Sequence, residues 1–195
     1  MTEKQYVYWS KVTVNHWNLY LAASAKGLCF VGSQNSPLEE LTAWLARRRP
    51  RHALVQDHEQ LAPYVTEISE YLQGTRQQFS LPLDLQGTPF QLSVWEALCQ
   101  IPYGQTASYT EIAARIQQPA AVRAVGAAIG ANPLLLTIPC HRVVGKNGSL
   151  TGYRGGLPMK TELIALEKGS LTRGMHAPPP GDHFHDAKKV GRDKK

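Results

Sequence analysis

The spacing of hydrophobic and polar residues over the first third of the chain predicts a small α/β unit. Three segments rich in Val, Tyr, Trp and Leu alternate as an antiparallel meander does, at residues 5–14, 17–23 and 28–32. Apolar residues at helical spacing predict helices over residues 38–48 and 58–72. Residues 79–83 then predict a short, edge-like strand.

After a linker at residues 84–87, the pattern becomes typical of a mainly helical unit. Thr88 and Pro89 supply an N-cap and a first-turn proline for the next helix. The apolar face of that helix consists of Phe90, Val94, Leu98 and Ile101.

A capping box at Ser108–Glu111 opens a short helix, and residues 120–129 predict another after a tight turn. The pair resembles a helix-turn-helix, although many such pairs pack without binding DNA. A last helix is expected over residues 158–168. We therefore predict a mixed α/β (α+β) fold. It has an N-terminal α/β domain with an antiparallel sheet over residues 1–84 and a mainly helical domain with the helix-turn-helix over residues 88–169.

The net charge of +6 is unevenly distributed along the chain. Residues 1–103 are close to neutral, whereas residues 104–167 carry six basic and three acidic side chains. Much of the remaining excess lies near the C-terminus, where we interpret residues 170–195 as a disordered basic tail. A cationic body favours a phosphate partner, although ordinary surface charge explains this pattern equally well.

Three cysteines, Cys29, Cys99 and Cys140, are too few and too widely spaced for a disulfide framework or a zinc site. We expect no metal and no cofactor. Cys29 falls in a predicted strand and Cys99 on a predicted helix face, so both are expected to be inert core residues.

The N-terminus has no apolar signal core, and no segment approaches the ~20 apolar residues of a membrane span. We expect a cytoplasmic protein without membrane contact, associated with the nucleoid if the source is bacterial.

The run from Ile138 to Val144 carries the strongest chemical signal. Cys140 and His141 place a thiol beside an imidazole, and the surrounding residues 104–161 hold six Lys or Arg and one acid. Only a thiolate is a strong nucleophile, so a reactive cysteine needs a nearby base. A thiol in such a cationic segment suggests a nucleophile that acts on a polyanion.

With the helix pair, the cysteine run and a glycine loop in order, the chain resembles the 6-O-alkylguanine-DNA alkyltransferases, the methylated-DNA–protein-cysteine methyltransferases. The similarity is strong over residues 88–168 and holds in outline for the first domain. The matching segments are Pro102-Tyr103-Gly104, Ser108-Tyr109, Arg123 to Gly126, Asn132-Pro133, Ile138 to Val144, Tyr153, Gly155 to Leu157 and Lys160 to Glu167.

The resemblance implies DNA repair by direct damage reversal, in a single irreversible turnover. Cys140 would take a methyl or larger alkyl group from 6-O-alkylguanine, and from 4-O-alkylthymine, in DNA. By resemblance, His141 accepts the thiol proton through a bridging water, and Glu167 holds the imidazole in the productive tautomer. Tyr109 is expected to donate a proton or hydrogen bond near the leaving base and to contact phosphate. Its alternative role is packing at the helix start.

The resemblance also assigns the substrate pocket to Asn132, Val143, Tyr153 and Arg154. Asn132 would anchor the turn before a reactive strand, although Asn-Pro is also a common turn signal. The target atom lies inside a duplex, so the nucleotide must be flipped out, here from the minor groove. Arg123 would replace the missing base, although a solvated helix charge is its ordinary interpretation. The expected DNA-binding residues are Tyr109, Arg123, Ala120, Ala121, Ala124, Ala127 and Lys146. The expected partner is double-stranded DNA containing alkylated guanine, bound by a monomer.

Two residues depart from the family pattern. Arg154 stands where the family usually has a small residue. Its side chain is expected either to narrow the pocket or, if only the backbone N–H serves the pocket, to add a phosphate contact. Gly130 replaces a position that is often basic, which predicts weaker DNA affinity.

Three other functions are compatible with parts of the sequence. A non-catalytic lesion-binding relative would lack the reactive cysteine, so the presence of Cys140 argues against it. A transcription regulator with a thiol sensor follows from the helix pair alone and predicts a dimer on a palindromic major-groove site. A cysteine hydrolase built on Cys140, His141 and Glu167 predicts more than one turnover per molecule.

Overall fold

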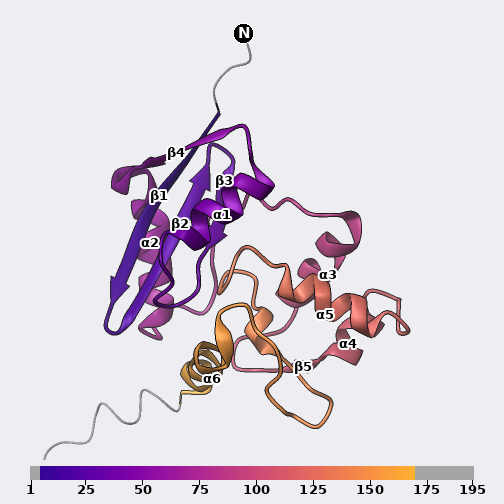
Figure 1. Ribbon diagram of the computed structural model, residues 1–195. Coiled ribbons are helices and arrows are strands. Elements are labelled where there is room, and N and C mark those ends of the chain that lie inside the picture. The colour runs from indigo at the N-terminus through magenta and orange to yellow at the C-terminus, as the bar shows by residue number, and fades with distance from the viewer. Residues whose placement is uncertain (1–4, 170–195) are drawn as a thin grey trace, which may run out of the picture.

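The computed structural model describes residues 5–169 of the 195-residue chain. The predicted tail at residues 170–195 lies outside the described residues. Within them the fold is mixed α+β, with a sheet and two helices in the N-terminal part and four helices in the C-terminal part, as the sequence predicts (Figure 1).

The N-terminal part contains a four-stranded sheet in the order β3-β2-β1-β4. The predicted meander is confirmed by three antiparallel strands: β1 (Gln5–Val14), β2 (Trp17–Ser24) and β3 (Gly27–Val31). The fourth strand, β4 (His52–Gln56), pairs in parallel with β1 and was not predicted. Its five residues stand between two strong helical patterns, and only pairing with a distant segment makes them a strand.

Two helices cover opposite faces of this sheet (Figure 1). Helix α1 (Glu39–Arg48) packs its buried Leu41 and Leu45 against one face. Helix α2 (His58–Leu72) packs against β1 and β2 on the other, and its bounds match the predicted ones. The side chains of successive strand residues alternate between the faces, so each helix meets its own apolar row. The core on the α2 side continues into the C-terminal part.

The edge of β3 is covered by two segments from farther along the chain. Leu83 forms an isolated parallel bridge with Leu28, so the predicted strand at residues 79–83 is reduced to one bridged residue. Leu134 forms a second bridge with Val31, and Val31 N donates to the Pro133 carbonyl at 2.9 Å. These contacts remove an exposed sheet edge and tie the sheet to the segment that leads to Cys140.

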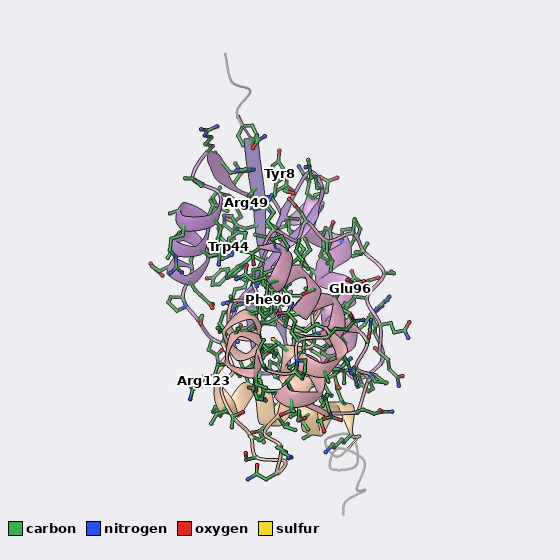
Figure 2. All side chains as sticks on the ribbon, turned by 90° about the vertical axis from the view of Figure 1, so that its right-hand side faces the viewer. Tyr8, Trp44, Arg49, Phe90, Glu96 and Arg123 are labelled. Atoms are coloured by element: carbon green, nitrogen blue, oxygen red, sulfur yellow. The ribbon has the colours of Figure 1, made fainter. Side chains whose placement is uncertain are left out.

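The predicted linker at residues 84–87 begins with a buried, anchored side chain. Asp84 accepts a hydrogen bond from Arg49 Nη1 at 2.6 Å, and both side chains are buried. Arg49 also lies over the Trp44 ring, with its guanidinium carbon 5.8 Å from the ring centroid (Figure 2). An ion pair taken out of water is costly to break, so the start of this segment is held to the first part of the molecule.

The C-terminal part is built from four helices: α3 (Pro89–Cys99), α4 (Tyr109–Arg115), α5 (Val122–Gly130) and α6 (Gly156–Glu167). The predicted N-caps are confirmed, because Thr88 and Ser108 each form a reciprocal capping box. Helices α4 and α5 form the predicted pair and pack with α3. Buried Trp95 on α3 donates to the Ala128 carbonyl at 2.8 Å, which holds α5 in place.

Two boundaries differ from the prediction in ways that affect the site. Helix α5 begins at Val122, so Ala120 and Ala121 lie in the turn before it. The cysteine run is not a strand at its reactive residue: Cys140–Arg142 form a single 3-10 turn, η1. A two-residue strand, β6 (Val143–Val144), follows and pairs in parallel with β5 (Ala107–Ser108).

Within residues 5–169 no helix has the length and apolar character needed to cross a membrane.

Candidate functional site

Cys140 is held at the end of a tightly folded loop that begins after α5. The Cys140 N–H donates to the Ile138 carbonyl at 2.7 Å across Pro139, and the Arg142 N–H donates to the Pro139 carbonyl at 3.0 Å. Proline restricts φ, which favours such a compact turn. The thiol is consequently buried: Cys140 is 2% exposed.

The side chain of Asn132 closes this loop from within. It is fully buried, and its Nδ2 group donates to Cys140 Sγ at 3.1 Å, to the Ile138 carbonyl at 3.1 Å and to the Leu134 carbonyl at 3.3 Å. Its Oδ1 atom accepts from the Leu134 N–H at 2.9 Å. Leu136, at the middle of the loop, has a φ of +70°, a strained value for a residue with a side chain. Asn132 therefore holds both the loop and the sulfur in place.

Burial raises the pKa of the Cys140 thiol, against the hydrogen bond from Asn132 and the positive charges of Arg154 and Lys160. These groups favour the thiolate but do not outweigh desolvation. In this state the sulfur is therefore a thiol, and it becomes a nucleophile only when a base takes its proton.

A base lies next to it in the chain. His141 is fully buried, and its Nε2 atom is 2.8 Å from Glu167 Oε1. Burial lowers the pKa of His141 despite the hydrogen bond and negative charge of Glu167, so the neutral imidazole is favoured. With Nε2 donating to Glu167, Nδ1 carries the free lone pair, and it has no hydrogen-bond partner within residues 5–169. This is the tautomer that can accept a proton.

Glu167 receives more donors than sequence reasoning identified. Arg142 contacts the carboxylate through Nε and Nη2 at 2.9–3.1 Å, and its Nη1 donates to the Ile101 carbonyl at 2.6 Å. The Gly104 N–H donates to Glu167 Oε2 at 3.0 Å. Burial alone would raise the pKa of Glu167, but the hydrogen bonds from His141 and Arg142 lower it to about 2. The carboxylate is therefore ionised throughout the physiological range.

Tyr71 also contacts this carboxylate, from helix α2 in the other part of the molecule. Its hydroxyl donates to Glu167 Oε1 at 2.5 Å and lies 3.2 Å from His141 Nε2. Nothing in the sequence indicates this contact, because Tyr71 is 70 residues from His141 and 96 from Glu167. Arg142, in contrast, belongs to the cysteine motif, and a charged residue among buried neighbours is a signal that could have been read.

Lys160 holds the loop between β6 and α6. It is fully buried, and its Nζ atom donates to the Val143 carbonyl at 2.5 Å and to the Thr151 carbonyl at 2.6 Å. Burial lowers its pKa to about 8. Lys160 belongs to one of the segments that resemble the family, but sequence reasoning assigned it no role. The structure shows that it fastens the loop that carries Tyr153.

The structure brings Tyr153 and Val143 close to the thiol and imidazole. The Tyr153 ring meets the His141 ring edge to face, with centroids 6.4 Å apart, and its buried hydroxyl has no hydrogen-bond partner within the described chain. Val143 is fully buried in β6. A side chain at Gly155 would collide with Tyr153, at 2.6 Å from its ring, and with Met159, so only glycine fits there.

Tyr109, the first residue of α4, lies between α5 and the same loop. Its hydroxyl accepts a hydrogen bond from Thr151 Oγ1 at 3.3 Å, and its ring faces Gly126. The side chain is half-buried, so it packs and still reaches the surface.

The side chain of Arg154 takes neither of the two expected positions. Its guanidinium lies at the junction of the two parts of the molecule, and the partners of its nitrogens are Glu40 Oε1 at 2.6 Å and the carbonyls of Val31 at 2.5 Å, Asn132 at 3.0 Å and Pro133 at 3.2 Å. It also lies over the Phe30 ring, 5.2 Å from the centroid. With these partners the side chain is directed into neither a base pocket nor a phosphate contact.

Most of the other residues expected to meet DNA lie on the surface of α5 or in the turn before it. Arg123, Ala124 and Ala127 are exposed on α5, and its opposite side is buried in the core. Figure 2 shows Arg123 at the periphery, pointing away from the molecule. Ala120 is exposed and Ala121 half-buried just before the helix; Lys146 is exposed in the turn after β6. Nothing approaches within 4 Å of the place where Gly130 would carry a side chain.

The other two cysteines differ in environment. Cys29 is buried in β3, as expected, and burial raises its pKa to about 12. Cys99 is exposed at the end of α3, so its expected core position is wrong. It is the last residue of the helix. Within the described residues, no group of three or more His, Cys, Asp or Glu side chains is arranged to hold a metal ion.

Comparison with protein families gives two adjoining matches along the chain. Residues 7–85 match the ribonuclease-like domain of the 6-O-methylguanine DNA methyltransferases, and residues 89–169 match the DNA binding domain of the same family. Together the two matches span most of the chain.

Individual relatives agree with this result. The chain is 60% identical over 167 residues to the inducible methylated-DNA–protein-cysteine methyltransferase of Bacillus subtilis strain 168, covering 86% of this chain and 93% of that protein. It resembles the crystal structure of Mycobacterium tuberculosis O6-methylguanine methyltransferase with a TM-score of 0.71 and 36% identity, covering 89% and 96% of the two chains. The structure of Mycobacterium tuberculosis OGT in complex with DNA gives a TM-score of 0.70 and 38% identity, covering 83% and 93%.

Proposed function

Because this chain belongs to the 6-O-methylguanine DNA methyltransferase family, we propose that it repairs DNA by moving a methyl or larger alkyl group from 6-O-alkylguanine onto Cys140. It is then a methylated-DNA–protein-cysteine S-methyltransferase. 4-O-alkylthymine, with its alkyl group on an equivalent exocyclic oxygen, is the second proposed substrate. One observation carries the proposal: a buried thiol, held by Asn132, adjoins a buried His141–Glu167 pair.

In the proposed reaction, the Cys140 sulfur attacks the alkyl carbon. A carbon–sulfur bond forms while the bond from that carbon to the guanine oxygen breaks, and guanine leaves with the electron pair. The thiol proton passes to Nδ1 of His141, the ring atom with no partner in the described chain, through a water because adjacent side chains rarely face each other. The thioether product does not hydrolyse, so each molecule reacts once.

Glu167 supports this proton transfer by orientation and charge. It holds Nε2 of His141 at 2.8 Å and so keeps Nδ1 as the acceptor, and it stabilises the imidazolium that forms. Arg142 pairs with the same carboxylate, which keeps Glu167 ionised and limits its pull on His141. The pair can therefore accept a proton without holding one permanently.

The leaving base needs a proton, which we assign to Tyr109. Its half-buried hydroxyl is free to donate, since its described hydrogen bond from Thr151 is one that it accepts. Solvent then restores the phenol proton. Asn132, Val143 and Tyr153 form the proposed base pocket beside the thiol, and Arg154 contributes only through its backbone, because its guanidinium is engaged elsewhere. Since Cys140 is 2% exposed, the base enters only when the covering side chains move.

We propose that the exposed face of α5 enters the minor groove and that the damaged nucleotide is flipped out. Small side chains at Ala124 and Ala127 permit close approach, and Arg123 projects from this face to replace the extruded base. Ala120, Ala121, Lys146 and Tyr109 complete the proposed contact with double-stranded DNA.

We propose two domains, residues 1–84 and 88–169, a division supported by the two family matches at 7–85 and 89–169. We propose that the protein acts as a monomer in the cytoplasm, at the nucleoid if the source is bacterial. The three free cysteines of the described chain support a reducing compartment.

Intact mass spectrometry tests the function directly. The full chain is mixed with excess duplex containing one 6-O-methylguanine, and one methyl is expected to replace one hydrogen per molecule, on the peptide holding Cys140. Cys140→Ala is expected to bind the duplex without gaining mass. Cys99→Ala, the matched control at the exposed cysteine, is expected to react as the wild type does. An unmodified wild-type protein, or methylation in Cys140→Ala, refutes the assignment, and more than one repaired base per molecule indicates a hydrolase instead.

A further inference from the structure

The hydroxyl of Tyr71 occupies an unusual place for a residue of the N-terminal part. Tyr71 lies in the last turns of α2, and its fully buried ring packs against Phe79 and Tyr103, with centroids 5.1 Å and 6.1 Å away. Its hydroxyl leaves this apolar setting and donates to Glu167 Oε1 at 2.5 Å. A side chain near the end of α2 therefore contacts the carboxylate that orients the proposed base.

That oxygen is shared. Oε1 of Glu167 is also the atom 2.8 Å from Nε2 of His141, and Nη2 of Arg142 donates to it at 2.9 Å. Each additional donor to a carboxylate oxygen stabilises its charged form and weakens it as an acceptor for the others. Tyr71 and His141 thus compete for one atom, with the Tyr71 hydroxyl 3.2 Å from Nε2.

Burial makes this competition matter. Tyr71, His141 and Glu167 have side chains that are 0–2% exposed, so water does not screen their interactions. Burial, together with the charge of Glu167, raises the pKa of Tyr71 well above its usual value. The hydroxyl is therefore protonated and remains a donor at every pH at which the protein works.

We propose that Tyr71 is a positioning residue of the alkyl transfer: through its hydroxyl, the N-terminal part of the molecule fixes Glu167 and limits how strongly that carboxylate holds the His141 N–H. This inference rests on the proposed function, because it concerns the same proton transfer. It gives the first domain a direct part in the chemistry carried out by the second.

The remaining charged or titratable groups facing the pair stay in place when this hydroxyl is removed. They come from η1, from the turn after α3, from the loop before α6 and from α6 itself: Cys140, Arg142, Tyr103, Tyr153 and Lys160. Loss of the hydroxyl alone leaves Oε1 to His141 and Arg142. The stronger pull on Nε2–H then makes the imidazole more basic, so His141 becomes protonated at a higher pH.

The test compares Tyr71→Phe with Tyr103→Phe in the full chain. Each variant loses one phenol oxygen from the same aromatic cluster, but the Tyr103 hydroxyl makes no hydrogen bond within residues 5–169. The rate of methyl transfer from a 6-O-methylguanine duplex is measured across the pH range. Tyr71→Phe is expected to move the acid limb of the profile upward by about half a pH unit, the scale of one modest hydrogen bond. Tyr103→Phe is expected to keep the wild-type limb.

A double-mutant cycle separates this role from a structural one. With Glu167→Gln as background, Tyr71→Phe is expected to cause no further displacement, because the shared carboxylate is gone. The inference is overturned if Tyr71→Phe lowers the rate equally at every pH, leaves the profile unchanged, or matches Tyr103→Phe. Wild-type protein that transfers no methyl group refutes the proposed function itself, so the two failures are distinguishable.

Discussion

Replacing Asn132 by alanine tests whether this one side chain holds the reactive loop. Four contacts are lost: the donations from Nδ2 to Cys140 Sγ and to the Ile138 and Leu134 carbonyls, and the acceptance from the Leu134 N–H. They are not equivalent. The Ile138 carbonyl still accepts from the Cys140 N–H, and the Leu134 carbonyl still accepts from the Ile138 N–H.

The Leu134 N–H is the group left without a partner, in a residue that is fully buried. An unpaired buried donor costs about 1–3 kcal/mol, and the other lost contacts add about 0.5–1.5 kcal/mol each. The loop also loses contacts that hold Leu136 in its strained backbone conformation. We expect Asn132→Ala to lower the free energy of unfolding by about 2.5–7.5 kcal/mol, a substantial part of the ~5–15 kcal/mol of a typical domain.

Urea unfolding measures this loss, and Asn147→Ala is the control. Asn147 accepts one hydrogen bond, from the Ser149 N–H at 3.1 Å, in an exposed turn, so water replaces its contact. Its removal is expected to cost less than about 1 kcal/mol. At a temperature where both variants are folded, only Asn132→Ala is expected to slow methyl transfer, because the hydrogen bond that favours the Cys140 thiolate is gone. Equal stability losses in the two variants would show that the loop is held by other contacts.

Three further outcomes are expected. Arg154→Ala is expected to destabilise the protein by about 1–3 kcal/mol in urea unfolding, because three backbone carbonyls lose a charged donor. Exposed Arg48→Ala, at the same junction, is expected to change stability by less than about 0.5 kcal/mol, and equal effects would show that Arg154 does not hold the two parts together. Arg123→Ala is expected to slow repair of duplex DNA but spare reaction with free 6-O-benzylguanine, measured by intact mass, and equal losses on both substrates would count against base replacement. The folded-state pKa of Glu167 is about 2, below its ordinary 4.5, so the stability that its charged form contributes is present above pH ~5 and is lost as the pH falls toward 2. Glu167→Gln, unlike exposed Glu96→Gln, is expected to flatten this acid-side decline of the urea midpoint, and an unchanged decline would show that Glu167 does not cause it.

Local chemistry explains why most of the elements could be predicted. Capping boxes at Thr88 and Ser108 need only the residues of one helical turn, and the bounds of α2 follow from apolar spacing within a single segment. Strand β4 escaped prediction because its five residues become a strand only through parallel pairing with residues of β1 that stand 47 positions earlier in the chain, as Gln5 does from His52. The expected strand at 79–83 also depends on a distant partner, and it does not form because it bridges β3 only at Leu83.

The chemistry of the site divides in the same way. Cys140, His141 and Glu167 could be proposed from the sequence as nucleophile, base and acidic partner, because the family motif carries the residue types that the reaction needs. Their arrangement could not. Cys140 lies in a 3-10 turn instead of a strand, since Asn132 binds its sulfur and the preceding carbonyls from inside the loop.

Residue types and short-range spacing were therefore enough to indicate the fold class and the family, and to propose Cys140 as the reacting residue. They could not indicate that Tyr71 shares an oxygen of Glu167, or that Arg154 turns toward Glu40 and away from the base pocket. A donor that folding removes from water pairs with protein acceptors, and in both cases those acceptors come from distant segments that meet only after the chain has folded.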